Sequence, residues 1–441
     1  MYSPGSKVAG FLTASSLRRN ISMTMARQVI GALLQLLVVV LLARSLGPEG
    51  NGQYAMAILV PTMLANFMSL GVGPATVYFV SRKDVSTSRA IEGNIRLGVL
   101  LSLAGVGLTV PVLGMWGSVL FPGVPVKLLC LGLLAFPLLL LTGYLVTILQ
   151  ALEEFRAFNA VVLIPPFVTL GMVIATLYIL DMGVYAGVVA YILGQLSGLV
   201  AVFLLIQKTQ RRATEGVRLF EAPLIDSGYS RNILRYGWKA HLSNIVTFIN
   251  YRSDIFLVNF FLSPAIGGIY VIAVQLAEKL WIPSQALSTV LLPRMGALSD
   301  DPQTRLNIAQ KGFLLITLVT GSLGAVSALA LYWLIGLVFG DAYKDAFLPF
   351  SWLLPGIVLW AGARIQANYL AALGKPEWNT YVAIAVLIIN ISGNIILIPI
   401  YGAIGAAIAT SIAYGVDATA KFLLMKRSMK LPIARTQRFE G

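Results

Sequence analysis

Charged residues inside apolar segments are the features of this sequence most able to do chemistry. Arg252 and Asp254 lie within TFINYRSDIFLVNFFLS (247–263), where an isolated charge in a membrane helix costs about 2.5–3.5 kcal/mol. Glu278 and Lys279 fall at a similar depth on the next apolar segment, at ~1.5 Å per residue. Two readings stay open: an internal ion pair, Arg252 with Glu278 or Asp254 with Lys279, or a cation left to face a cavity.

Three further cations invite the same question. Lys421 follows Asp417 at the i,i+4 spacing of a local helical pair, so we expect these two residues to be structural. Arg27 and Arg364, the latter within LWAGARIQANYL, have no acidic residue three or four positions away. Because a guanidinium grips phosphate oxygens with two parallel donors and keeps its proton, these arginines are candidates to bind phosphate.

The predicted site therefore has two parts. Substrate-binding cations are Arg27, Arg252, Arg364 and Lys279. Ion-coupling carboxylates or members of structural pairs are Asp254, Glu278 and Asp417. Amides in the same segments could hydrogen-bond sugars or neighbouring helices; they are Gln35, Asn66, Asn244, Asn250, Gln275, Gln366, Asn368, Asn390 and Asn394.

Composition places these residues in a membrane. The 441 residues are 58% hydrophobic and 11% charged, with a mean hydropathy of +0.83, far from the ~25% charged composition of soluble domains. The net charge of +14 does not point to nucleic acid, because the basic residues lie mostly between apolar spans. A single cysteine, Cys130, and a single histidine, His241, disfavour disulfide and zinc chemistry. No P-loop pattern occurs, and we expect no cofactor.

Taking ~20 apolar residues per crossing, we predict an all-α polytopic membrane protein with twelve transmembrane helices. LGVGPA, from Leu70, is expected to interrupt the second of them. The predicted spans are about 24–46, 50–80, 91–120, 126–150, 157–180, 183–207, 236–262, 265–295, 309–338, 347–373, 378–399 and 402–426.

The distribution of basic residues orients these spans. With the N-terminus inside, Lys and Arg concentrate in the cytoplasmic connections, and the opposite side receives Arg44, Lys127 and Lys344. By the positive-inside rule, both termini are cytoplasmic. The polar connection from Lys208 to Arg235 is the longest, so we predict an N-terminal six-helix lobe (1–207), a cytoplasmic linker (208–235), and a C-terminal six-helix lobe with a basic cytoplasmic tail (236–441).

The two predicted lobes resemble each other. LGPEGNGQYAMA from Leu46 matches LSPAIGGIYVIA from Leu262, and this match aligns Pro48 with Pro264 and Gly52 with Gly268. LFPG, LQAL and FLLIQK in the first half match VFGD, LAAL and FLLMKR in the second, in the same order. Two lobes related by a pseudo-twofold axis around a central cavity follow from such a repeat. The repeat also places Arg252 on Leu36 and Asp254 on Val38, so the first lobe lacks both charges.

The sequence resembles polysaccharide flippases of the multidrug/oligosaccharidyl-lipid/polysaccharide superfamily. The resemblance covers nearly the whole chain and includes SMTMARQVIGALLQLLVVVLLARSLGPEGNGQYA and NYRSDIFLVNFFLSPAIGGIYVIAVQLAEKLWIPSQALSTVLLPRM. It implies a transporter, not an enzyme, that flips an undecaprenyl-pyrophosphate-linked oligosaccharide across the cytoplasmic (inner) membrane for surface polysaccharide biosynthesis. We expect a monomer in contact with membrane lipid and with polysaccharide polymerase machinery.

Three alternatives stay open. A cation-coupled drug efflux antiporter of the same superfamily needs an embedded carboxylate, which Asp254, Glu278 or Asp417 could supply. A peptidoglycan-precursor flippase would have similar cavity chemistry but two extra C-terminal helices. A membrane-embedded glycan polymerase would need external catalytic acids, for which Asp341 and Asp345 are the candidates.

Overall fold

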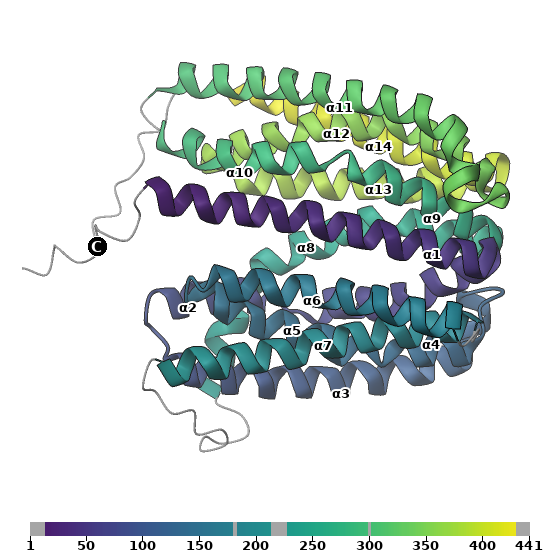
Figure 1. The fold of residues 1–441 in the computed structure, drawn as a ribbon. Coiled ribbons are helices and arrows are strands. Elements are labelled where there is room, and N and C mark those ends of the chain that lie inside the picture. Colours follow the sequence, from purple (N-terminus) through teal and green to yellow (C-terminus); the bar gives the residue numbers. More distant parts are fainter. Residues whose placement is uncertain (1–13, 180–182, 213–226, 299–300, 429–441) are drawn as a thin grey trace, which may run out of the picture. The chain divides into compact units, whose positions relative to one another are not determined.

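The structure, a computed structural model, describes residues 14–179, 183–212, 227–298 and 301–428 (Figure 1). Every regular element in these ranges is a helix, which confirms the all-α class. The end of the predicted basic tail (429–441) and half of the predicted linker (213–226) lie outside the described residues. The helices of the first half are α1 (Ala14–Met68), α2 (Val72–Ser81), α3 (Thr87–Leu120), α4 (Val126–Leu133), α5 (Ala135–Ala151), α6 (Phe155–Val173), the π-helical turn η1 (Ile174–Ile179) and α7 (Gly183–Arg212).

The second half begins with α8, the helix that carries Arg252 and Asp254. A proline occupies the first position of α9, α11 and α13, where its missing N–H leaves no helical hydrogen bond unmade. The elements are α8 (Ser227–Phe261), α9 (Pro264–Lys279), α10 (Ile282–Ala297), α11 (Pro302–Phe339), the 3₁₀ turn η2 (Asp341–Ala346), α12 (Phe347–Ala372), α13 (Pro376–Tyr401) and α14 (Ala403–Ser428).

Two glycines break the first long helical region where the sequence indicates. Gly47 has a φ of 66° and a ψ of −179°, so α1 is two helices joined at a kink rather than one straight rod. Pro48 follows and disfavours a helical conformation in the residue before it. Past Met68, Leu70 (φ 45°) and Gly71 (φ 70°) turn the chain into α2. The predicted interruption at LGVGPA is therefore confirmed.

The count of twelve spans is not confirmed. In the described part of the chain, 10 helical segments are long and apolar enough to cross a membrane. One difference arises because the first two predicted spans form a single continuous segment, Met25–Met68. The other is α8, which is long enough to cross but carries Arg252, Asp254 and several asparagines, and these lower its hydropathy. The other predicted spans each overlap one of these segments.

The chain divides into two compact units that do not follow the sequence halves exactly. Unit 1 comprises residues up to 248 together with 258–272 and 335–344, and unit 2 comprises 249–257, 273–334 and 345 onward. α8 therefore contributes to both units. The lobe boundaries drawn from the repeat stay a prediction, because compact packing and sequence repetition are different properties of the chain.

Unit 1 is held together by close helix packing. α6 lies along α7, and α1 contacts α4, α5, α6 and α7. Small residues allow this approach: a Cβ on Gly132 would lie 2.2 Å from the carbonyl oxygen of Ala57. Helices in lipid gain little from burying apolar surface against each other, so such contacts and interhelical hydrogen bonds hold them together.

The two LxPxxxG motifs of the predicted repeat meet within unit 1. A Cβ added to Gly52 would lie 1.8 Å from the carbonyl oxygen of Pro264, and one added to Gly268 would lie 2.0 Å from that of Pro48. The Asn51 side-chain amide donates to the Gly268 carbonyl oxygen at 3.1 Å. Residues that the repeat makes equivalent are thus in reciprocal backbone contact, and only glycine fits at either position.

Unit 2 is built around α12 and α14. α14 packs along both α12 and α13, and α10 packs on α12. Gly356 lies against Ser411, whose hydroxyl donates to the Trp352 carbonyl oxygen at 2.5 Å. The charged middle of α8 joins this unit, and its side chains project among α9, α12, α13 and α14.

Candidate functional site

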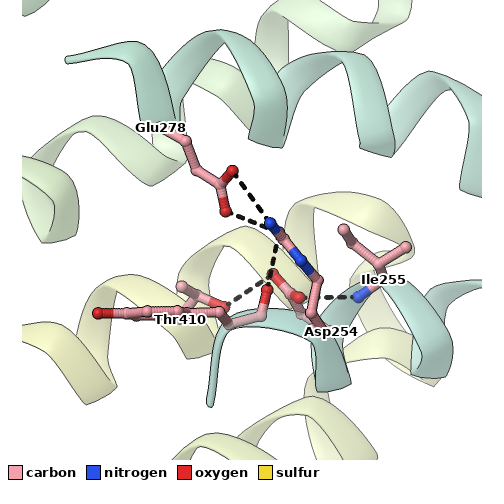
Figure 2. A network of polar contacts seen from close by, with 6 residues as sticks. Asp254, Ile255, Glu278 and Thr410 are labelled. Atoms are coloured by element: carbon pink, nitrogen blue, oxygen red, sulfur yellow. Dashed lines mark hydrogen bonds and ion pairs between the residues drawn. The ribbon is translucent and has the colours of Figure 1, made fainter. Parts of the chain in front are cut away.

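Arg252 forms an ion pair with Glu278. The Nη1 atom of Arg252 lies 2.7 Å from Oε1 of Glu278, and Nη2 lies 3.4 Å from Oε2, so the contact is bidentate. Figure 2 shows the Glu278 carboxylate turned toward this contact from the helix above Asp254. One of the two predicted pairings is therefore confirmed. Binding of substrate by Arg252 stays a prediction, and its side chain is 35% exposed.

Asp254 accepts hydrogen bonds from a backbone N–H and from a hydroxyl. Its Oδ1 accepts from the Ile255 backbone N–H at 2.8 Å, and its Oδ2 accepts from the Thr410 hydroxyl at 3.5 Å (Figure 2). Thr410 in turn accepts from the Asn390 amide at 3.4 Å. The Asp254 carboxylate also interacts electrostatically with Arg252. Asp254 is buried, and α8, α13 and α14 meet around it.

The amides of α13 extend this cluster. Asn390 Oδ1 accepts from the Asn394 amide at 2.9 Å and from the Ser253 hydroxyl at 3.3 Å. Asn394 Oδ1 is buried without a hydrogen-bond partner in the structure. The region therefore presents one carboxylate and several neutral oxygens within unit 2, the kind of group that receives a hard cation or a proton.

Lys279 is the last residue of α9, and Asp417 lies on α14. Lys421 Nζ lies 2.7 Å from Asp417 Oδ2, and both side chains are buried, which confirms the predicted structural pair. The Lys279 ammonium interacts electrostatically with Glu278 and Arg252. A pair between Lys279 and Asp254 stays a prediction.

Arg364 is held by aromatic rings rather than by an acid. Its Cζ lies 4.6 Å from the centroid of the Trp360 ring, one turn earlier on α12. The Tyr251 hydroxyl lies within hydrogen-bonding reach of the same guanidinium. Among the residues that the structure describes, Arg364 forms no ion pair. This agrees with the sequence argument that Arg364 lacks an acidic neighbour along its own helix.

Arg27 belongs to unit 1 and has a different setting. Its Cζ lies 5.8 Å from the ring centroid of Phe158 at the start of α6. Its Nε is buried and makes no hydrogen bond in the structure. Arg252, Lys279 and Arg364 all belong to unit 2. A phosphate-binding role for Arg27 or Arg364 stays a prediction.

The sequence reasoning missed the aromatic cluster that surrounds Arg364. Tyr251, Trp281, Trp360 and Tyr414 come from α8, the α9–α10 junction, α12 and α14. Trp281 and Trp360 have ring centroids 4.4 Å apart, and Tyr251 lies 5.3 Å from the first and 5.5 Å from the second. The i,i+4 spacing of Trp360 and Arg364 was the available signal, because it places both on one helix face.

Several predicted amides have ordinary structural partners. Asn250 donates to the Ala383 carbonyl oxygen at 3.2 Å, and Asn368 donates to the Ser288 hydroxyl at 2.7 Å. Both polar atoms of the fully buried Gln366 lack a partner. Within the described ranges, no group of three or more His, Cys, Asp and Glu side chains is arranged to hold a metal ion.

Comparison with known proteins agrees with this picture of a transporter. Residues 41–348, well over half of the chain, match the family described as polysaccharide biosynthesis protein. The probable flippase AglR of Haloferax volcanii is 28% identical over 188 residues, which cover 40% of this chain and 37% of AglR. The match thus spans under two fifths of that relative's length.

Solved structures show the fold. A lipid II flippase, MurJ, in an inward closed conformation superposes with a TM-score of 0.73 at 17% identity, covering 91% of this chain and 87% of that one. An inward-facing multidrug resistance MATE family transporter of the MOP superfamily gives 0.72 at 14% identity, with 91% and 94% covered. The chain has the fold of these structures, and by its match over residues 41–348 it belongs to the polysaccharide biosynthesis protein family.

Proposed function

We propose that the chain moves an undecaprenyl-pyrophosphate-linked oligosaccharide from the cytoplasmic to the outer leaflet by alternating access of two lobes. The family match supports transport of a polysaccharide precursor. The pyrophosphate link is the finer part of the proposal, and the embedded arginines support it. The protein acts in the cytoplasmic (inner) membrane as a monomer, with both termini in the cytoplasm, and delivers substrate to polymerase machinery outside.

Arg364 carries this proposal. An arginine within a membrane helix costs about 2.5–3.5 kcal/mol, and most such residues are offset by an acidic partner. Arg364 instead has Trp360 and Tyr251 as neighbours, which leave its positive charge uncompensated. A transporter that must carry a multiply anionic head group gains from such a charge, because a guanidinium binds phosphate oxygens with two donors.

The other candidate residues take subsidiary roles. Arg27 in unit 1 is also proposed to bind phosphate, and its buried Nε, which makes no hydrogen bond in the structure, is a donor available to a phosphate oxygen. Lys279 and Arg252 add positive potential near the site, while the ion pair with Glu278 fixes the orientation of α8 relative to α9. The unpartnered amide of Gln366 is a candidate for a hydrogen bond to a sugar.

The experiment compares single alanine variants in a deletion strain. Arg364→Ala and Arg27→Ala should abolish surface glycan while leaving protein abundance near normal, since neither residue is part of an ion pair in the described structure. Arg294→Ala, an exposed arginine on α10, is the matched control and should restore glycan fully. Normal glycan export by both the Arg27 and the Arg364 variants would defeat the proposed site.

A cation-coupled drug antiporter is the second candidate function, and Asp254 is the observation that favours it. The Asp254 carboxylate is buried, accepts hydrogen bonds from the Ile255 N–H and the Thr410 hydroxyl, and interacts electrostatically with Arg252. A buried carboxylate within a membrane helix can bind a coupling ion, so Asp254 is the proposed coupling carboxylate in either function. Altered drug tolerance of the deletion strain with intact surface glycan would establish efflux and reverse the ranking.

The polymerase alternative receives less support. Asp341 lies 2.8 Å from Lys344 in an exposed ion pair within η2. The intervening Tyr343 is buried and donates to the Ala43 carbonyl oxygen at 3.2 Å. These contacts are those of a turn that caps two helices. Retention of glycan polymerisation in an Asp341→Asn and Asp345→Asn double variant is the expected result.

A further inference from the structure

The aromatic cluster in unit 2 surrounds the arginine to which the proposed function assigns phosphate binding. The cluster consists of Tyr251, Trp281, Trp360 and Tyr414. Trp281 and Tyr414 are buried, whereas Tyr251, Trp360 and Arg364 are half-buried. The arginine and the ring it contacts are thus more exposed than the Trp281 and Tyr414 rings of the same cluster.

The rings of the cluster contact one another. Trp360 has the Trp281 ring at 4.4 Å with an interplanar angle of 34°, and the Arg364 guanidinium at 4.6 Å. Tyr251 meets Trp360 edge to face, at 5.5 Å and 77°. A sugar that stacks on an aromatic side chain needs a free ring face. Trp360 is already flanked by two neighbours, so the cluster is better suited to hold Arg364 than to bind a sugar itself.

Holding the guanidinium by its face leaves its donors available. Arginine carries five N–H donors, all in the plane of the guanidinium. The Arg364 Cζ lies over the Trp360 ring, and such a contact restrains the guanidinium but uses none of these donors. The Tyr251 ring packs edge to face on Trp360, and its hydroxyl lies on the side of the same guanidinium. The remaining N–H groups can meet a phosphate in a fixed direction, which lowers the ordering cost of binding.

The whole set is specific to the second half of the chain. The repeat places Tyr251 on Gln35. The match of LAAL at Leu370 with LQAL at Leu149 places Trp360 on Leu139 and Arg364 on Gly143. The first half therefore builds the corresponding helices without the arginine and without either ring that contacts it. Helix packing alone does not require these three side chains.

We propose that Trp360 and Tyr251 are positioning residues that fix the plane of the Arg364 guanidinium so that it grips the phosphate of the lipid carrier. This inference rests on the proposed function, because it assumes that Arg364 meets a phosphate. Tyr251 and Trp360 act through Arg364 and do not contact the substrate themselves.

The test measures binding of geranylgeranyl pyrophosphate to the purified full-length protein in detergent, with geranylgeraniol as the probe that lacks phosphate. Trp360→Leu should weaken pyrophosphate binding about tenfold, the size of a partly desolvated cation–π contact. Tyr251→Phe, which removes only the hydroxyl, should weaken it about threefold to tenfold. Trp352→Leu, an exposed tryptophan on the same helix, is the matched control and should bind as the wild type does. Binding of the alcohol should not change in any variant.

A double-variant cycle separates positioning from a general structural role. In the Arg364→Ala background, Trp360→Leu should cause no further loss of pyrophosphate binding, because the residue it positions is absent. Equal losses in both backgrounds, or wild-type binding by Trp360→Leu and Tyr251→Phe, would overturn the inference and leave the proposed function standing. Failure of the wild-type protein to distinguish the pyrophosphate from the alcohol would overturn both. Thermal melting identifies any variant that is unfolded. If Trp360→Leu is unfolded, Tyr251→Phe still tests the inference.

Discussion

The interiors of the two units contain different kinds of polar interaction. In unit 1, Asn94 accepts from the Tyr229 hydroxyl at 2.7 Å and donates to Thr76 at 3.1 Å and to the Tyr144 carbonyl oxygen at 3.2 Å. This network is neutral. The interior of unit 2 contains Arg252 with Glu278, Asp417 with Lys421, and the buried Asp254.

The difference concerns the kind of polar group that each interior holds. Neutral hydrogen bonds satisfy buried polar groups at modest cost, whereas each embedded charge must be compensated. In unit 1, the ion pair of Arg96 with Glu92 lies in the first three turns of α3. The predicted repeat aligns Arg252 with Leu36 and Asp254 with Val38, so we propose that these two charges of unit 2 serve export rather than folding.

Removing Asp417 should have the largest effect on stability. Asp417→Ala leaves Lys421 buried without its partner, which costs about 3–5 kcal/mol. We expect strongly reduced abundance and a lower melting temperature in detergent. An Asp417→Leu and Lys421→Met double variant should recover most of the stability, since an apolar pair of similar volume replaces a buried ion pair without penalty. Equal stability of Asp417→Ala and wild type would show that unit 2 tolerates an unpaired charge.

Exchanging residues between the repeats tests whether the charges of unit 2 are needed for folding. The repeat places Arg252 on Leu36 and Glu278 on Thr62. Arg252→Leu alone leaves Glu278 unpaired and should destabilise by about 2 kcal/mol, between the values for exposed and buried pairs. Adding Glu278→Thr should restore the melting temperature. If the double variant melts as low as the single one, the pair is essential to the fold and the comparison between units is wrong.

The neutral network of unit 1 should respond more weakly. Tyr229→Phe removes the hydroxyl that donates to Asn94 and should cost about 1 kcal/mol. Surface glycan should be unaffected, because the network contains no charge that a phosphate could meet. Chemical denaturation and a glycan assay on the same preparations check both statements. A loss of export at normal stability would assign a role in export to this neutral network.

The smallest effect is expected at a charge outside the membrane. Asp301 Oδ1 accepts from the Thr304 N–H at 3.0 Å at the start of α11, and hydrogen bonding from the Thr304 side chain and from this N–H lowers the pKa of the Asp301 carboxyl. A lowered folded-state pKa means that the stabilisation is present above the ordinary carboxyl pKa and is lost as pH falls through the lowered value. Amide hydrogen exchange at Thr304 should therefore speed up only at acidic pH. Asp301→Asn, which retains the cap, should remove that pH dependence.

Local chemistry made much of the fold predictable. The i,i+4 spacing located the Asp417–Lys421 pair, and depth matching across an antiparallel turn located the Arg252–Glu278 pair. The Gly47–Pro48 and Leu70–Gly71 breaks followed from the backbone preferences of glycine and proline. The predicted count of twelve spans differs from the 10 apolar helical segments of the described residues. The kink in α1 does not divide the segment Met25–Met68, and the charges of α8 lower the hydropathy of that helix.

The contacts around Arg364 could not be predicted from the sequence, for a physical reason. Tyr251, Trp281 and Tyr414 come from helices far apart in the chain, and aromatic residues are common in membrane helices for many reasons. Only tertiary packing brings these rings together. The hydrogen bond of Asp254 with Thr410 depends likewise on the register of α8 against α14, which helical periodicity does not fix.

The central claim is that an uncompensated guanidinium in unit 2 carries the pyrophosphate of a lipid carrier. Its most direct test is the rate at which the protein in proteoliposomes flips a fluorescent polyprenyl pyrophosphate, measured with a membrane-impermeant quencher, for wild type, Arg364→Ala and Arg294→Ala. The account predicts a loss on the order of a hundredfold for Arg364→Ala, the size expected when one partner of a close charge pair is truncated, and an unchanged rate for Arg294→Ala. Wild-type flipping by Arg364→Ala would contradict it.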